Sequence, residues 1–164
     1  MNPKISTSKA HAKTRMGVFL LESTASGLYA LHFPKRYAAA GRGHSTIGFL
    51  RDYFRNPRAS CSKLKLDLNG YTPFQRKVYA VLRKVPVGQV ITYGELAKRA
   101  GYPKAARAVG TAMRKNRLPI VIPCHRVIKS NGGLGQYSGG IKRKRFLLRH
   151  EGYLNNPSIY TSGL

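Results

Sequence analysis

Residues 92–116, Thr-Tyr-Gly-Glu-Leu-Ala-Lys-Arg-Ala-Gly-Tyr-Pro-Lys-Ala-Ala-Arg-Ala-Val-Gly-Thr-Ala-Met-Arg-Lys-Asn, carry the pattern that decides the fold. Thr92 and Glu95 have the spacing of a capping box, which predicts a short helix running to Ala100. A tight turn is expected at 101–103, where glycine and proline interrupt the pattern, and a second helix over 104–116. Two short helices joined by a glycine-containing turn are typical of a helix-turn-helix unit.

Further helices are predicted on both sides of this unit. Thr72-Pro-Phe-Gln75 is a second capping box with proline at the first helical position, and the apolar residues after it fall on one helix face. A last helix is expected over 141–150. These signals predict a helical C-terminal domain over 71–164.

The first 70 residues have a different pattern and predict a small α/β domain over 1–70. Residues 17–23 and 28–33 read as two strands of a hairpin, and 46–55 has the apolar spacing of a helix. The first 16 residues are expected to be mobile, and residues 38–45 to form a loop. The chain as a whole is therefore predicted to be α+β.

The charge of the chain indicates a polyanionic partner. Its 164 residues include 30 lysines and arginines against 5 acids, a net charge of +25. Nucleic acid is the favoured partner, because Lys and Arg release condensed counterions when they neutralise phosphates. A membrane surface is the competing explanation, but no apolar run approaches the roughly 20 residues that span a bilayer.

Two cysteines and no secretory pattern indicate an intracellular chain with reduced thiols. Neither Cys-x-x-Cys nor a paired histidine spacing is present, so no metal site is expected.

The stretch Pro119-Ile-Val-Ile-Pro-Cys-His-Arg-Val127 is the best candidate for chemistry. A thiol is strongly nucleophilic only as thiolate, so Cys124 needs a base or a positive field nearby. His125 is adjacent in sequence and can serve as that base. The dipeptide alone is also compatible with a buried cysteine beside a surface histidine.

The predicted helix over 104–116 is unusual for a DNA reader. Arg107 is its central large polar residue, and small residues surround it at 105, 106, 108, 110 and 112. Such a smooth face suits the minor groove, which is about 6 Å wide. The small residues are equally compatible with packing against another helix.

Several motifs in the same order resemble the O⁶-alkylguanine-DNA alkyltransferase family. They are Tyr93-Gly-Glu-Leu96, Pro103-Lys-Ala-Ala-Arg-Ala-Val-Gly110, Ala112-Met-Arg114, Asn116, Pro123-Cys-His-Arg-Val127, Tyr137-Ser-Gly-Gly140 and His150-Glu-Gly152. The resemblance covers residues 72–152, and residues 1–70 match only loosely. It implies a ribonuclease-H-like N-terminal domain and a winged helix-turn-helix DNA-binding C-terminal domain.

The resemblance also implies an activity. The chain would repair double-stranded DNA by transferring an alkyl group from O⁶-alkylguanine, and from O⁴-alkylthymine, irreversibly to its own Cys124. It would act once, as a cytoplasmic or nucleoid-associated (nuclear, if eukaryotic) monomer, without cofactor, metal or membrane. The excess of positive charge goes beyond what this mechanism needs.

The family roles are carried over position by position. In the catalytic group, Cys124 is the nucleophile, His125 its base through a water, and Glu151 the group that orients the histidine. Tyr93 donates to guanine N3, and Asn116 holds the loop before the active site.

Two further groups of residues follow from the resemblance. Arg107 enters the base stack when the lesion base is flipped out, which is required because O⁶ is shielded inside the duplex. The DNA-binding residues are Arg107, Ala105, Ala106, Gly110 and Arg114. The substrate pocket is lined by Pro119, Val127, Tyr137 and Ser138.

Three questions stay open at this level. Lys144 matches a position that assists the tyrosine, yet it lies in the basic cluster 142–145 and could equally contact a phosphate. Tyr93 could be an ordinary aromatic at a helix start. A DNA-binding module without catalysis and a Cys-His hydrolase are the competing functions.

Overall fold

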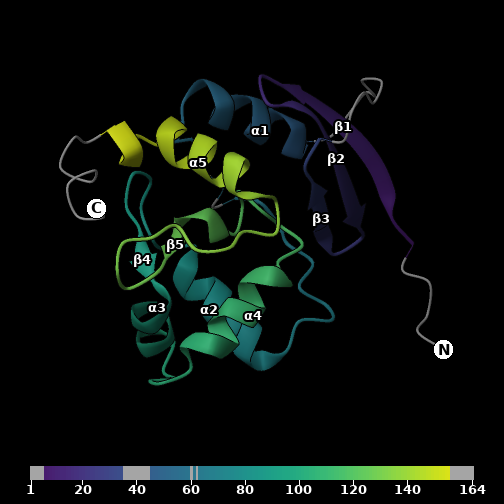
Figure 1. Ribbon diagram of the computed structural model, residues 1–164. Coiled ribbons are helices and arrows are strands. Elements are labelled where there is room, and N and C mark those ends of the chain that lie inside the picture. The colour runs from purple at the N-terminus through teal and green to yellow at the C-terminus, as the bar shows by residue number, and fades with distance from the viewer. Residues whose placement is uncertain (1–5, 35–44, 60, 62, 156–164) are drawn as a thin grey trace. The chain divides into compact units, whose positions relative to one another are not determined.

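The computed structural model describes residues 6–34, 45–59, 61 and 63–155. The chain forms two compact units, Met1–Asn69 and Gly70–Leu164. Both helices and small sheets are present, so the chain is α+β (Figure 1). The loop predicted over 38–45 lies outside the described residues, except for Ser45, which begins a helix.

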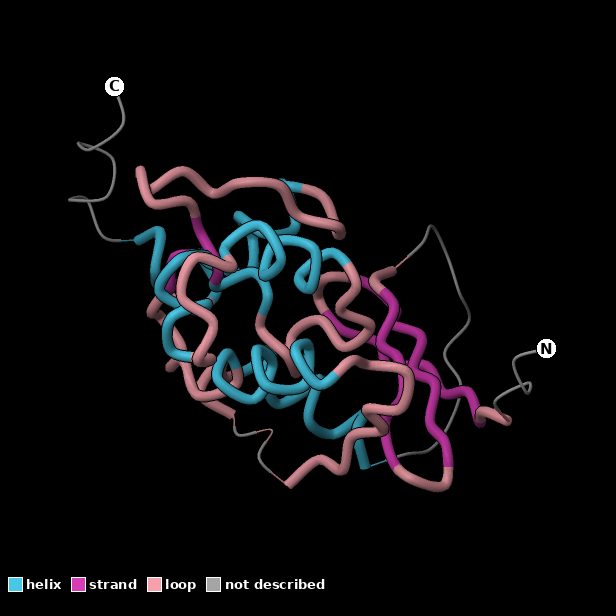
Figure 2. Tube along the Cα trace, turned by 90° about the horizontal axis from the view of Figure 1, so that it is seen from below, coloured by secondary structure: helices cyan, strands magenta, loops and turns pink. Residues whose placement is uncertain are grey.

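The N-terminal unit is an antiparallel sheet with a helix packed on it. Its strands β1 (Ser8–Thr14), β2 (Gly17–Thr24) and β3 (Gly27–His32) lie side by side in sequence order (Figure 2). Helix α1 (Ser45–Arg55) buries Leu50 and Phe54, and Phe54 lies 5.7 Å from Phe19 between ring centroids. The two predicted strands and the helix are confirmed.

The prediction that the first 16 residues are mobile was wrong for residues 8–14. These residues pair with β2 along their whole length, from Ser8 with Ser23 to Thr14 with Gly17. Ala10 and Ala12 are buried, whereas Lys9 and Lys13 are exposed. The buried side of β1 therefore consists of alanines, which give only a weak period-two hydrophobic signal.

The C-terminal unit consists of helices around one short parallel pair of strands. The strands β4 and β5 pair through Ile91 with Val127 and Thr92 with Ile128. The elements are α2 (Pro73–Leu82), β4 (Ile91–Thr92), α3 (Tyr93–Arg99), α4 (Ala106–Arg114), the 3₁₀ helix η1 (Cys124–Arg126), β5 (Val127–Ile128), α5 (Ile141–His150) and the 3₁₀ helix η2 (Tyr153–Asn155).

The predicted helix starts of this unit differ in how they are capped. The Thr72 hydroxyl accepts from Gln75 N, and the Gln75 side chain accepts from Thr72 N, so this capping box is complete. Thr92 accepts from Glu95 N in the same way, but the Glu95 carboxylate accepts from Nε of Arg99 at 2.8 Å. Helix α5 has the predicted bounds.

Helix α4 is shorter than predicted. It begins at Ala106, because Lys104 has a φ of 72° and so lies in the left-handed region, and it ends at Arg114. Val109 and Ala112 are buried, while Arg107 is exposed. One face of α4 therefore packs inside the unit, and the other face is open. Within the described residues, no helix is long and apolar enough to cross a membrane.

Candidate active site

The segment between α4 and η1 places Cys124, and Asn116 holds it in shape. Asn116 Nδ2 donates to Ile122 O at 2.9 Å and to Cys124 Sγ at 3.1 Å, while Oδ1 accepts from Leu118 N at 2.9 Å. Ile120 has a φ of 72°, which for a β-branched residue costs about 1–3 kcal/mol and persists only when its surroundings enforce it. Such strain is typical of functional sites.

His125 belongs to a buried ionic cluster. Its Nε2 lies 2.8 Å from Glu151 Oε1, and both side chains are fully buried. Arg126 donates from Nε to Glu151 Oε2 and from an Nη to Oε1, both at 2.8 Å, and from its other Nη to Val85 O at 2.6 Å. The carboxylate thus binds both side chains of the dipeptide that follows the cysteine.

The charge states in this cluster follow from burial and hydrogen bonds. Burial alone would raise the pKa of Glu151, but the hydrogen bonds from His125 and Arg126 outweigh it and hold that pKa far below its usual range. Burial lowers the pKa of His125, and the Glu151 carboxylate only partly opposes this. A neutral imidazole beside a carboxylate carries its proton on Nε2.

The other nitrogen of His125 is therefore the one able to accept a proton. Nδ1 is buried and has no hydrogen-bond partner among the described residues. Buried polar atoms are normally paired, so an open nitrogen one residue from a thiol is a functional signal.

Cys124 is 4% exposed. Burial raises the pKa of its thiol, against the hydrogen bonds with Asn116 and Tyr137 and the charge of Lys144. The thiol and the Tyr137 hydroxyl are 3.9 Å apart. The resting group is thus a thiol, which needs a base in order to react.

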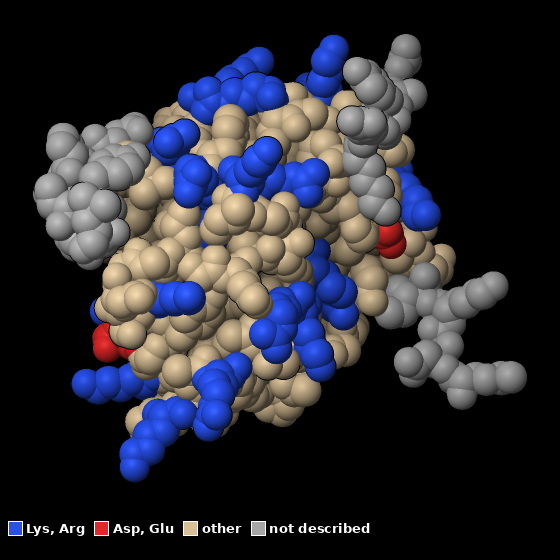
Figure 3. Space-filling model, in the orientation of Figure 1, with Lys and Arg blue, Asp and Glu red and all other residues tan. Residues whose placement is uncertain are grey.

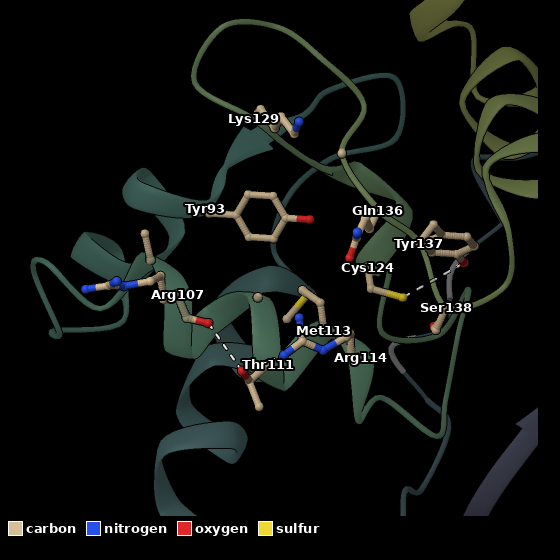
Figure 4. A pocket seen from close by; sticks show the side chains of 13 residues that line it. Tyr93, Arg107, Thr111, Met113, Arg114, Cys124, Lys129, Gln136, Tyr137 and Ser138 are labelled. Carbon is tan, nitrogen blue, oxygen red and sulfur yellow. Dashed lines mark hydrogen bonds between the residues drawn. The ribbon is translucent and has the colours of Figure 1, made fainter.

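A pocket of about 630 Å³ opens onto Cys124 (Figure 4). Tyr93 of α3 points its ring into this pocket, and Arg107 and Arg114 of α4 border it. The full lining is Tyr93, Ala106, Arg107, Gly110, Thr111, Met113, Arg114, Cys124, Lys129, Gly135, Gln136, Tyr137 and Ser138.

Tyr93 fits closely between two glycines. A Cβ on Gly135 would lie 3.3 Å from the Tyr93 hydroxyl oxygen, and one on Gly110 3.9 Å from its ring. Burial, and then the charge of Cys124, raise the pKa of Tyr93, so it stays protonated and able to donate. Its place in the lining goes beyond that of an ordinary aromatic at a helix start.

The structure brings most of the predicted site residues together. Asn116, His125 and Glu151 surround the thiol segment, while Tyr93, Ala106, Arg107, Gly110, Arg114, Tyr137 and Ser138 line the pocket with Cys124. Ala105 is the N-cap of α4 and lies outside the lining. Pro119 and Val127 were expected in the lining, but both are buried outside it.

Sequence reasoning missed some residues of the site. Thr111 could have been found, because it follows Arg107 by one helical turn. Arg126 lies within the motif Pro123-Cys-His-Arg-Val127, but the motif alone assigned it no role. Lys129 and Gln136 gave no signal, because their place depends on the path of the loop after β5.

Lys144 does not contact phosphate, because its side chain is fully buried. Its Nζ donates to the carbonyl oxygens of Val127 and Leu134. Burial lowers its pKa to about 8. Lys144 thereby links α5 to β5 and to the loop that follows β5. Among the described residues, no group of three His, Cys, Asp or Glu side chains could hold a metal ion.

Comparisons of the sequence with known proteins identify relatives of this chain. A family model described as 6-O-methylguanine DNA methyltransferase, DNA binding domain, matches residues 73–153. The methylated-DNA–protein-cysteine methyltransferase of Salmonella typhimurium is 54% identical over 105 residues, which are 64% of this chain and 61% of that protein. The human protein of the same name is 44% identical over 118 residues, covering 68% and 56%. The chain thus matches less than two thirds of the length of these relatives.

Solved structures match over nearly the full length. The O⁶-methylguanine methyltransferase of Mycobacterium tuberculosis has a TM-score of 0.77 at 34% identity, covering 93% of this chain and 96% of that one. The OGT of the same organism in complex with DNA has a TM-score of 0.76 at 34% identity, covering 94% and 98%. With the buried Cys-His-Glu cluster and its pocket, these matches show that the chain belongs to the O⁶-methylguanine-DNA methyltransferase family.

Proposed function

We propose that this chain repairs DNA by moving the alkyl group of O⁶-alkylguanine to Cys124, once per molecule. The observation that carries the proposal is the thiol at the pocket, next to a histidine whose far nitrogen is fixed on a buried carboxylate. This is the arrangement of nucleophile, base and orienting group that activates a thiol.

The step is an in-line displacement. The Cys124 proton passes to the open Nδ1 of His125, through a bridging water, and Sγ forms a bond with the alkyl carbon. The bond from that carbon to O⁶ breaks, and its electron pair leaves with guanine. Tyr93 donates a hydrogen bond to guanine N3 as negative charge develops on the departing base.

Glu151 and Arg126 support this step without touching the substrate. The imidazole becomes an imidazolium when it takes the proton, and the carboxylate 2.8 Å away stabilises that charge. Arg126 fixes both carboxylate oxygens, so the orientation of the histidine ring is set in advance.

The open face of α4 is the proposed DNA contact. Arg107 is exposed at the edge of the pocket, with Ala106 and Gly110 beside it in the lining. Small neighbours would let the helix lie in the minor groove of double-stranded DNA, while Arg107 fills the gap left by a flipped base. Arg114 adds a positive charge to the lining of the same pocket.

The proposal also includes more specific features of the chain. They are the use of O⁴-alkylthymine, a monomeric state, a cytoplasmic or nucleoid-associated place in the cell, and the two domains 1–70 and 71–164. We also propose a ribonuclease-H-like sheet in the first domain and a winged helix-turn-helix in the second.

Mass analysis after incubation with excess methylated duplex tests this function. We expect one added methyl group, located on Cys124, and then no further reaction. Cys61→Ala is the matched control and should react as wild type, whereas Cys124→Ala should bind DNA without reacting. Repeated turnover, or methyl on Cys61, would contradict the proposal, and binding without any transfer would identify a non-catalytic module.

A further inference from the structure

The N-terminal unit has a hollow of its own, of about 480 Å³, where the β1–β2 turn meets the end of α1. Four of its six lining residues are basic and none is acidic. The lining residues are Lys13, Thr14, Arg15, Arg51, Phe54 and Arg55. The four basic side chains are exposed, and we call this site the basic hollow. Because like charges repel, such a concave group of cations is stabilised by an anion that occupies it.

One side of the basic hollow is a rigid turn. The Thr14 hydroxyl donates to Gly17 O at 2.9 Å and accepts from Met16 N at 3.1 Å. Gly17 has a φ of 117°, and a Cβ there would lie 2.8 Å from Pro34 Cβ, so only glycine fits. The backbone that carries Lys13 and Arg15 is thereby fixed.

The other side is the last turn of α1. The buried Phe54 ring contacts Phe19, and Phe19 pairs with Ala12 of β1, so this end of the helix is held against the hairpin. Arg51 and Arg55 are four residues apart and therefore lie on one helix face. Asp52, the acid nearest in sequence, is not part of the lining.

We propose that the basic hollow binds a backbone phosphate of DNA and gives the N-terminal unit a DNA contact separate from the active site. This rests on the proposed function only in taking DNA as the polyanion. Arginine forks and lysines are the groups that grip phosphodiesters without reading sequence. On the face shown in Figure 3, Lys and Arg side chains far outnumber acids, consistent with a net charge of +25.

The lining favours DNA over an anionic membrane. Its single apolar residue, Phe54, is 5% exposed and packs inside the unit. A surface that enters a bilayer needs exposed apolar side chains beside its cations. The basic hollow offers four exposed cations on a fixed backbone, which suit a phosphate group.

Two full-length variants with equal loss of charge test the proposal. The hollow variant carries Lys13→Gln, Arg15→Gln, Arg51→Gln and Arg55→Gln. The control variant carries Lys9→Gln, Arg58→Gln, Lys63→Gln and Lys65→Gln, all exposed positions of the same unit outside the lining. Affinity for an undamaged duplex is measured by fluorescence anisotropy over a salt series.

We expect the hollow variant to lose more affinity than the control, and its log–log salt slope to fall by roughly 0.9 for each lost phosphate contact. Equal affinities and slopes for the two variants would overturn the proposal. If the hollow variant does not fold, Arg51→Gln with Arg55→Gln is compared with Lys63→Gln and Lys65→Gln instead.

Two further measurements separate this proposal from its alternatives. Binding to phosphatidylglycerol–phosphatidylcholine vesicles that is lost only in the hollow variant, with DNA binding equal to the control, would show a lipid partner and overturn it. Reaction of the wild-type chain with free O⁶-benzylguanine tests the proposed transfer without DNA. Failure there would count against the transfer and leave the comparison of duplex affinities intact.

Discussion

Asn116 Nδ2 lies 3.1 Å from Cys124 Sγ and donates to it, so one side chain both shapes the preceding segment and stabilises negative charge on the sulfur. The same amide holds the backbone at Leu118 and Ile122. The Cys124 thiol is therefore tuned by a side chain that lies outside the pocket lining.

Asn116→Ala should slow reaction with free O⁶-benzylguanine by about 10- to 100-fold, because a hydrogen bond to a charged group contributes roughly 1.5–3 kcal/mol. Its rate profile should also move to higher pH, since the Asn116 hydrogen bond lowers the pKa of the thiol. Stopped-time mass analysis over a pH series measures both. Asn131→Ala, an exposed loop position, is the control; a slower reaction with an unmoved profile would limit Asn116 to a structural role.

Arg107→Ala should slow repair of duplex DNA far more than reaction with free O⁶-benzylguanine. The free base needs no flipping, so only the duplex reaction includes the unstacking cost of a few kcal/mol. Arg107→Lys should restore part of the duplex rate, because the cation remains but the planar fork is lost. Lys115→Ala, just beyond α4, is the control, and equal slowing on both substrates would assign Arg107 to the fold or the active site instead.

Glu151→Gln should destabilise the chain at neutral pH by about 3–5 kcal/mol, because Arg126 is left buried without its carboxylate. The pKa of Glu151 is lowered on folding, so its contribution is present above the unfolded value of 4.5 and is lost as pH falls toward the folded value. The variant should therefore show a flatter fall in stability below about pH 4.5.

Urea unfolding over a pH series gives this comparison. His125, whose pKa is also lowered on folding, adds a loss of stability below its ordinary value of 6.5. Glu95→Gln removes an exposed partner of Arg99 and should change little. Parallel acid profiles for wild type and Glu151→Gln would contradict the assigned ionisation.

Lys144→Met should reveal the cost of burying an ammonium group. Folding lowers the pKa of Lys144 from 10.5 to about 8, so between these values the unfolded chain holds more protons and this contribution to stability rises with pH. The unfolding free energy of wild type minus that of the variant should thus rise between pH 8 and 10.5, by at most about 1.4 kcal/mol per unit. Lys142→Met, at an exposed site of the same helix, is the control for loss of a lysine.

Much of the C-terminal unit could be predicted because its signals are local. A capping box depends on residues three positions apart, and Thr72 with Gln75 fulfilled it. Strand β1 was missed because its buried positions are alanines. The later start of α4 was missed because Lys104, whose backbone is left-handed, is not a residue such as glycine that would signal this conformation.

The site could be predicted only as far as the family motifs reach. Cys124, His125 and Glu151 were found in this way, and the structure brings the last two together. The residues that line the pocket were harder to predict. Pro119 and Val127 are buried outside the lining, and Lys129 enters it because of the path of a loop that no local sequence pattern predicts. The two hydrogen bonds from Arg126 to the Glu151 carboxylate join residues that lie 25 positions apart in sequence.

That long-range contact sets an order of events during synthesis of the chain. The ribosome makes Cys124, His125 and Arg126 well before Glu151, which caps the end of α5. Until α5 has been made, His125 and Arg126 lack the Glu151 carboxylate that binds them both. Of the two groups that accept hydrogen bonds from Arg126 in this cluster, the Val85 carbonyl is the one already made. Under the proposed function, the nascent chain therefore carries Cys124 without an oriented base until Glu151 has been made and α5 has folded.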